Sequence, residues 1–271
     1  MGSTHADSSV ARWINGERLV VLGWPRAIVM QVAHPLVAAG VADHSSFRQG
    51  GVAAVTRLRH TIRAMRRLTC GDQTARDESL ARIRAIHRRV HGRLAAGVGP
   101  FPAGTPYSAE DPALVLWVHL TLLDSLPRLY DLVVEPLSES KRDTFCGEAA
   151  ETAVLLGAHD ADVPRSWSAL QRALAETLAS GAIVVGDQAR DLARAVLRPR
   201  LGFVASPAIA LTRLLSIGTL PDVVRQAYGW SWTTRDERRL RRAVRLLRVG
   251  RRFAPECVAR WPEARRGAPR I

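Results

Sequence analysis

The stretch that decides the fold is GGVAAVTRLRHTIRAMRRLTCGDQTARDESLARIRAIHRRVHG, residues 50–92. Apolar residues recur in it at intervals of three and four, which is the period of an α-helix. They form two stripes, one of Val55, Leu58, Ile62 and Met65 and one of Leu80, Ile83, Val90 and, just beyond the stretch, Leu94. Gly71 and Asp72 lie between the stripes. The segment therefore predicts two helices joined by a tight turn.

The helical period continues in both directions, and no series of strands is indicated. Helices are predicted at residues 10–23, 25–41, 51–69, 74–95, 109–134, 138–157, 164–182, 187–197, 206–216, 220–229, 234–249 and 254–261. The long Gly- and Pro-rich interruption at 97–106 is interpreted as a lid or a connector. We predict an all-α fold with one multi-helix domain at 12–262, a disordered segment at 1–11 and a basic tail at 263–271.

Composition limits the class of protein. The chain has 271 residues, a formal charge of +14 and a single lysine, Lys141. A GC-rich genome would produce this preference for arginine over lysine, and attraction to an anionic partner is the alternative. The three cysteines are far apart, and the N-terminus has no apolar run. Both observations favour a reducing, cytoplasmic location without a secretory signal.

Residues 235–252 contain nine arginines around Leu240, Val244 and Leu247. This pattern predicts an amphipathic helix with a basic face. The face is either simply solvated or makes peripheral contact with an anionic membrane. No nucleic-acid-binding motif accompanies the charge, so nucleic acid is not an expected partner.

Motifs of several common enzyme classes are missing. The sequence has no H-E-x-x-H, no Walker loop, no G-x-S-x-G elbow and no Glu-x-x-His repeats. Hydrolases, kinases, nicotinamide enzymes and carboxylate di-iron proteins therefore gain no support.

His87 is the most informative histidine, because it continues the apolar stripe of the second predicted helix. A buried imidazole needs partners for its ring nitrogens. A structural hydrogen bond is one answer, and an iron or zinc ligand is the other. His91 follows at chelating i,i+4 spacing but drifts toward the polar edge of the helix.

The first predicted helix has a second face, made of Ala53, Arg57, Thr61, Ala64 and Leu68, with His60 at its margin. Small residues there leave room for a flat ligand, although a partly exposed helix flank would look the same. At about 1.5 Å per residue, Thr61 and His87 lie roughly 15 and 22 Å from the turn. In a hairpin these depths are similar, so a planar cofactor between the helices would reach both.

Three further residues have two interpretations each. His34 precedes Pro35 and marks a bend, where a structural hydrogen bond is expected and cofactor contact is the alternative. Asp43 is either a polar helix end or a general base. His119 lies in a very apolar helix and must be satisfied by a polar group or by a cofactor.

Five segments occur in one order and together resemble a known family. They are QVAHPLVAAGVADHSSF, RLRHT, IHRRVHG, YSAEDPALVLWVH and LPDVVRQAYGWSW. In combination they are similar to the MpaB-type oxygenases and the catalytic domain of rubber oxygenases, over residues 12–232. The resemblance implies a globin-like helical core that binds haem b.

The resemblance also implies roles for single residues. His87, in the H-x-x-V motif, would be the axial iron ligand, and Arg57 and Thr61 would form the distal side. Asp43 corresponds to the family's acidic residue, which is more commonly glutamate. His60 stands where rubber-cleaving members carry a lysine that approaches the iron. His60 would therefore either ligate iron as a sixth ligand or face water.

The first functional hypothesis is a haem-dependent oxygenase that cleaves an alkene in an apolar, isoprenoid-like substrate with O₂. The second is a non-enzymatic haem protein for storage, transport or sensing, with bis-histidine iron. The third is a structural helical protein bound to an anionic membrane. No obligate protein partner is inferred.

Overall fold

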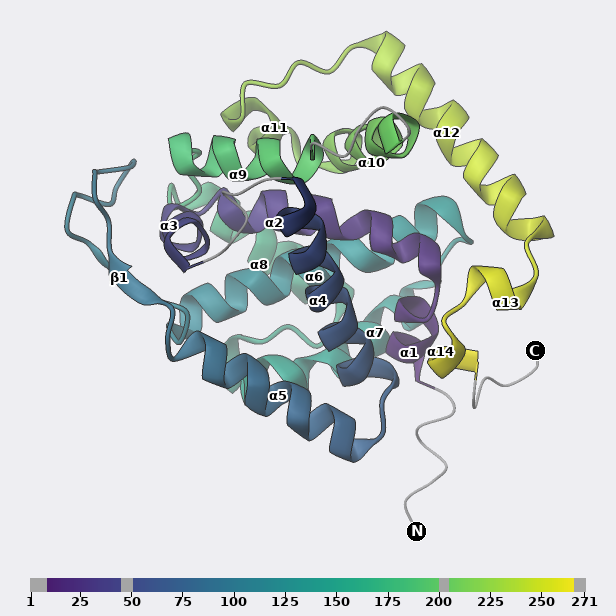
Figure 1. Ribbon diagram of the computed structural model, residues 1–271, viewed down its shortest axis with the longest axis horizontal. Coiled ribbons are helices and arrows are strands. Elements are labelled where there is room, and N and C mark those ends of the chain that lie inside the picture. Colours follow the sequence, from purple (N-terminus) through teal and green to yellow (C-terminus); the bar gives the residue numbers. More distant parts are fainter. Residues whose placement is uncertain (1–8, 45–50, 200–204, 266–271) are drawn as a thin grey trace.

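The computed structural model describes residues 9–44, 51–199 and 205–265, with the backbone alone for residues 51–55, 57 and 58. This part of the chain is mostly helical with almost no strand and forms one domain, which confirms the predicted all-α class (Figure 1). Its first half contains α1 (Val10–Asn15), the 3-10 helix η1 (Arg18–Gly23), α2 (Trp24–Val32), α3 (Pro35–His44), α4 (Gly51–Cys70), α5 (Gln73–His87), β1 (His91–Arg93), β2 (Pro106–Ser108) and α6 (Pro112–Val133). Its second half contains α7 (Glu139–Leu155), η3 (Asp160–Asp162), α8 (Trp167–Ala179), α9 (Asp187–Leu197), α10 (Ser206–Thr219), α11 (Asp222–Ala227), α12 (Thr234–Phe253), α13 (Glu256–Ala259) and α14 (Pro262–Arg265).

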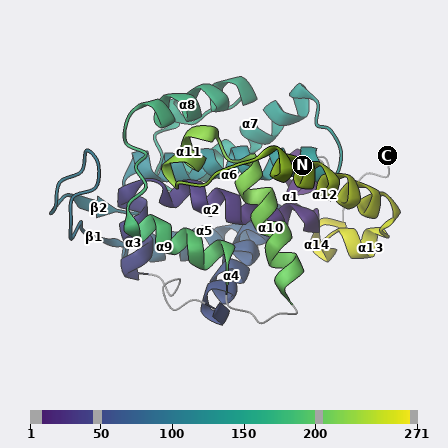
Figure 2. The same cartoon turned by 90° about the horizontal axis from the view of Figure 1, so that it is seen from above.

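Helix α6 is the centre of the fold, with α2, α7 and α8 packed around it (Figures 1 and 2). Most of its side chains are buried, among them Trp117, Leu120 and Tyr130. A helix that is apolar on nearly all sides is stable only when other elements cover it. Asp111 caps its first turn by accepting hydrogen bonds from the Ala113 and Leu114 amides, and Pro112 fits the first helical position.

A buried ion pair joins α2 to α6. Arg26 donates to the Asp124 carboxylate at 2.6 Å, and the Asp124 side chain has no exposed surface. Arg128 and Gln171 donate to the other carboxylate oxygen, while Arg26 also donates to Ser125. Burial alone would raise the pKa of Asp124, but the two guanidinium groups lower it to about 2. The buried charges of Arg26 and Asp124 therefore compensate each other, which a buried pair requires.

The chain turns sharply between α2 and α3, at the position where His34 and Pro35 predict a bend. The helical segment Arg18–Val32 and α3 meet at 111°. Proline has no amide hydrogen and disfavours helical geometry in the residue before it, so one continuous helix cannot form here. By length and composition no single described helix is a candidate membrane span, whereas this bent pair passes the test when both parts are taken together.

The predicted helix at 74–95 is too long. Helix α5 ends at His87, and residues 91–93 form β1, which pairs antiparallel with β2. Backbone hydrogen bonds explain the difference, because the Ala109 amide donates to the Val90 carbonyl and the Leu94 amide to the Thr105 carbonyl. These long-range bonds replace the helical ones, and the predicted 97–106 segment is a connector within the hairpin.

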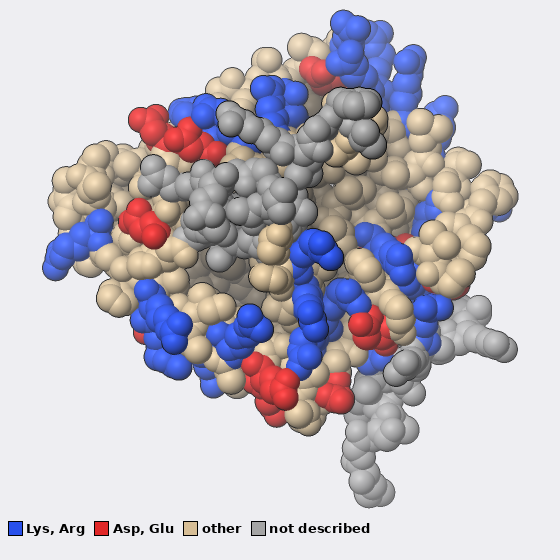
Figure 3. Space-filling model, viewed as in Figure 1, with Lys and Arg blue, Asp and Glu red and all other residues tan. Residues whose placement is uncertain are grey.

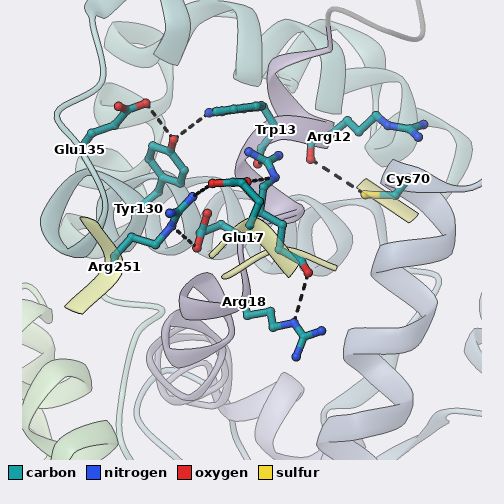
Figure 4. A network of polar contacts seen from close by, with 10 residues as sticks. Arg12, Trp13, Glu17, Arg18, Cys70, Tyr130, Glu135 and Arg251 are labelled. Atoms are coloured by element: carbon teal, nitrogen blue, oxygen red, sulfur yellow. Dashed lines mark hydrogen bonds and ion pairs between the residues drawn. The ribbon is translucent and has the colours of Figure 1, made fainter. Parts of the chain in front are cut away.

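A polar network ties the C-terminal helices to the beginning of the chain (Figure 4). Glu17 is buried and accepts a hydrogen bond from Arg251 at 2.8 Å. Arg251 also donates to Glu256 at 2.7 Å, and the buried Arg260 guanidinium stacks 3.6 Å from the centre of the Trp13 ring. Burial raises the pKa of Glu17, and the Arg251 contact opposes that rise. The network fixes the end of α12 against the body of the domain.

The predicted domain limits remain predictions. Helix α1 already begins at Val10, inside the segment predicted to be disordered, and α14 reaches Arg265 within the predicted tail. Residues 1–8 and 266–271 lie outside the described residues.

Replacing Asp124 with asparagine removes the charge that compensates Arg26. We expect the free energy of unfolding to fall by about 3–5 kcal/mol, the usual cost of breaking one side of a buried pair. Because the folded-state pKa of Asp124 lies below its ordinary value, this stabilisation is present above about pH 4 and is lost as the pH falls toward 2. Urea unfolding across this pH range measures both effects.

Asp191→Asn is the matched control, since it breaks the Arg194–Asp191 pair, whose side chains are both about two-thirds exposed. The control should lose less than about 1 kcal/mol. Equal losses in the two variants would contradict a structural role for the buried pair.

Candidate functional site

The candidate site is built on the hairpin of α4 and α5, which pack against each other as predicted. Asp72 caps α5 by accepting a hydrogen bond from the Ala75 amide at 2.8 Å. Such a cap satisfies an amide that the first helical turn would otherwise leave unpaired. The turn at residues 71–72 thus directs the chain back along α4.

The second face of α4 is turned toward the protein. Thr61 and Ala64 are half-buried and Leu68 is buried, whereas His60 is exposed. Arg57 shares this face by helical spacing, and its side chain lies outside the described residues. Where they can be assessed, the residues predicted to line a ligand slot are therefore at least partly covered by the protein, and His60 is turned to solvent.

His87 is the last residue of α5 and is half-buried, one turn beyond the half-buried Ile83 and two beyond the buried Leu80. The predicted stripe therefore points inward. Nδ1 of His87 is buried and has no hydrogen-bond partner among the residues that the structure describes. Burial lowers the pKa of His87, and the charge of Glu110 offsets part of that effect. The ring is therefore neutral at physiological pH, and its buried nitrogen is not bonded by any described residue.

His119, on α6, also has a buried ring nitrogen that no described residue bonds. This nitrogen is Nε2, and burial lowers the pKa of His119 to about 4. A buried polar atom without a partner costs about 1–3 kcal/mol. Two unpartnered imidazole nitrogens within one small domain require an explanation, and a bound ligand supplies one.

His34 has the structural hydrogen bond expected for it. Its Nδ1 accepts from the Leu36 amide at 3.3 Å, and its ring lies 5.3 Å from that of Phe101. Burial lowers its pKa to about 4. The bend between α2 and α3 accounts for this histidine without a cofactor.

Asp43 lies at the end of α3 and is held by a residue that sequence reasoning missed. The Tyr107 hydroxyl donates to Asp43 Oδ2 at 2.6 Å. Burial, together with this contact, raises the pKa of Tyr107, so its hydroxyl remains a donor at neutral pH. A Cβ at Gly92 would lie 2.5 Å from the same hydroxyl, so glycine is required in β1 for Tyr107 to reach Asp43.

His91 does not form the chelating pair that its spacing suggests. Because α5 ends at His87, His91 lies in β1 instead, is exposed, and accepts through its carbonyl from His44 Nε2 at 3.0 Å. Among the described residues, no three His, Cys, Asp or Glu side chains come together in a way that could hold a metal ion.

The sequence alone does not reveal Tyr107 or Glu110 as parts of the site. Tyr107 reaches Asp43 only because β2 packs on α3, and Glu110 influences His87 only because the chain between β2 and α6 passes near the end of α5. Both residues lie in the YSAED part of a motif that resembles a known family, and that is the only signal pointing to them.

Comparison with known proteins identifies one family. The model described as ER-bound oxygenase mpaB/B'/Rubber oxygenase, catalytic domain, matches residues 11–249. This range includes α4, α5, α6 and both strands. Searches of curated proteins and of solved structures returned no match.

The unpartnered imidazole on α6 predicts a specific acid sensitivity. The folded-state pKa of His119 lies below its ordinary value, so its stabilising effect is present above about pH 6.5 and is lost as the pH falls toward 4. In His119→Leu the loss of unfolding free energy between pH 7 and 5 should be smaller by roughly 2 kcal/mol. Urea titrations of the ligand-free protein at several pH values measure this difference.

His159→Leu changes an exposed histidine and serves as the control, with a pH dependence like that of the unaltered protein. Identical pH profiles for the His119 and His159 variants would show that His119 is not kept neutral by burial.

Proposed function

The chain belongs to the family of MpaB oxygenases and rubber-oxygenase catalytic domains, and we propose that it is a haem b-dependent oxygenase that uses O₂ to cleave an alkene in an apolar, isoprenoid-like substrate. Family membership supports the oxygenase class itself. The cofactor, the substrate class and the residue roles are our proposal.

The observation that carries the proposal is the half-buried ring of His87 on the inward-facing stripe of α5, whose Nδ1 is buried and has no hydrogen-bond partner among the described residues. A metal is bound by the neutral form of imidazole, and burial favours that form of His87. His87 lies on the inward-facing stripe of α5, so the hairpin sets the direction in which its ring points. A single axial imidazole of this kind, next to an apolar slot, is what haem b requires of a protein.

Haem b would supply the redox chemistry that O₂ needs, and the protein would supply binding, orientation and polarity. The inward face of α4 fits the side opposite His87. Ala64 is small enough to leave space for a flat ring, Leu68 is apolar, and Thr61 supplies a hydroxyl. Arg57, which shares this face, would add a positive charge that favours negative charge developing on oxygen.

Asp43 is the proposed general base. Tyr107 donates to Oδ2, which orients the carboxylate and leaves Oδ1 to accept a proton from the substrate. The exposure of Asp43 at the end of α3 agrees with a group that meets an incoming substrate. Tyr107 is thus a positioning residue, since it acts through Asp43.

The exposure of His60 bears on the alternative function. A sixth ligand must approach the iron from inside the pocket, whereas His60 is exposed on α4. This observation favours an open sixth position, and hence an oxygenase, over bis-histidine iron in a storage, transport or sensing protein.

Adding haem to the purified protein should produce an intense Soret absorption band with one haem per chain. His87→Ala should abolish this band or weaken haem affinity by at least about 100-fold, since outer contacts to a metal site alone are worth 10–100-fold. His91→Ala is the matched control and should bind haem normally. A protein without a Soret band, or a His87→Ala variant that binds haem like the control, would refute the proposal.

Asp43→Ala should lower the turnover of an isoprenoid alkene by about 100-fold or more, the usual contribution of a general base. Tyr107→Phe should have a smaller effect, of roughly tenfold, because it only loosens the carboxylate. Oxygen consumption and the appearance of carbonyl products measure turnover, and the Soret band shows that haem binding is unchanged. Full activity in the Asp43 variant would exclude it as the base.

A further inference from the structure

Helix α12 has two apolar rows on opposite sides. The inner row contains Leu240, Val244 and Leu247, which pack against side chains of α6 and α10. The outer row contains Leu246, Val249 and Phe253, whose exposed fractions are 73%, 51% and 79%. The outer residues are three and four positions apart, so they share one face. Single exposed apolar residues are common, but a row of three on one helix marks an interaction site.

Arginines surround the outer row. Four exposed arginines point to the same side of α12 by helical spacing: Arg238, Arg242, Arg245 and Arg252. None of the four forms a hydrogen bond or ion pair with a described residue. The only acidic residues of α12 are Asp236 and Glu237, in its first turn. Figure 3 shows a prominent group of Lys and Arg side chains, in blue, at the upper right, where Figure 1 shows the first part of α12.

The helix is held firmly, so its outer face has a fixed orientation. Arg248 donates to the carbonyls of Asp131 and Leu132 at 2.7 Å, and Arg251 donates to the buried Glu17. Thr233 and Asp236 form a reciprocal capping box at the other end. The fold therefore stabilises α12 through its inner side and both ends, and leaves the outer row uncovered by any described residue.

We propose that the outer face of α12 docks on a membrane surface that contains anionic lipid. The apolar row would enter the boundary between headgroups and acyl chains, while the arginines would bind lipid phosphates. Guanidinium groups suit this task, since they bind phosphate in a bidentate manner. The helix lies on the membrane and does not span it.

Charge favours this occupant over a second copy of the chain. A two-fold interface through the same face would bring the arginines of one copy against those of the other, with no acidic residue of that face to neutralise them. A lipid surface offers a dense array of phosphates to the arginines. Beneath the phosphates it offers an apolar layer to Phe253.

Vesicle sedimentation of the full chain tests the proposal. The protein should bind vesicles of phosphatidylserine and phosphatidylcholine, and bind much more weakly to phosphatidylcholine alone or in high salt. Phe253→Ser should lower the affinity for the anionic vesicles by about tenfold or more, the scale set by losing a buried apolar side chain. Val223→Ser changes an apolar residue that is also 51% exposed, on α11, and should have no effect.

A second pair of variants separates local from overall charge. Arg242→Gln with Arg245→Gln should weaken binding by about tenfold or more, since each arginine near the surface contributes roughly fivefold. Arg82→Gln with Arg89→Gln removes the same charge from exposed positions on and just after α5, and should bind like the unaltered protein. Circular dichroism confirms that all four proteins are folded.

Three results would overturn the proposal. The first is that the protein does not bind anionic vesicles. The second is that the two double arginine variants lose vesicle affinity equally. The third is that the protein self-associates without binding vesicles, and that Phe253→Ser abolishes the self-association. The last result would assign the outer face to a second copy of the chain. None of these measurements depends on haem or on oxygenase activity.

Discussion

The Arg26–Asp124 ion pair places two opposite charges in the buried interface between α2 and α6. Such a pair is tolerated only when its remaining hydrogen-bonding capacity is used, and here Ser125, Arg128 and Gln171 use it. The geometry of these contacts fixes α2 against α6 and includes α8 through Gln171. His119, within α6, is thereby carried on a helix that is fixed against its neighbours, and a binding site gains precision from such rigidity.

The candidate site adds a second constraint, because the ring nitrogens of a buried histidine need hydrogen-bond partners. In His34, Nδ1 accepts a hydrogen bond from the Leu36 backbone amide. His87 and His119 each have a buried ring nitrogen without a partner among the described residues, although burial keeps both rings neutral. A neutral ring with a buried lone pair is poorly suited to a folded protein by itself, but it is the form a metal ligand must take. The proposed ligand would use the His87 ring in this form.

Helical periodicity predicts the α4–α5 hairpin and the inward direction of His87, because both depend on local spacing. It fails beyond His87, where Val90 and Leu94 continue the helical pattern but their backbone groups bond to residues 105–109. Tertiary pairing overrides local preference there. Tyr107 escapes prediction for the same reason, since its contact with Asp43 joins residues 64 positions apart. The outer row of α12 is present in the sequence, yet only the fold shows which of the two apolar rows the core covers.

Diffraction from crystals of the haem-loaded protein, recorded at the iron absorption edge, tests the central claim most directly. We expect one anomalous iron peak per chain, within bonding distance of a ring nitrogen of His87 and facing the Thr61 side of α4. A peak bonded to another residue, or an iron-free hairpin in crystals that contain haem elsewhere, would contradict the account.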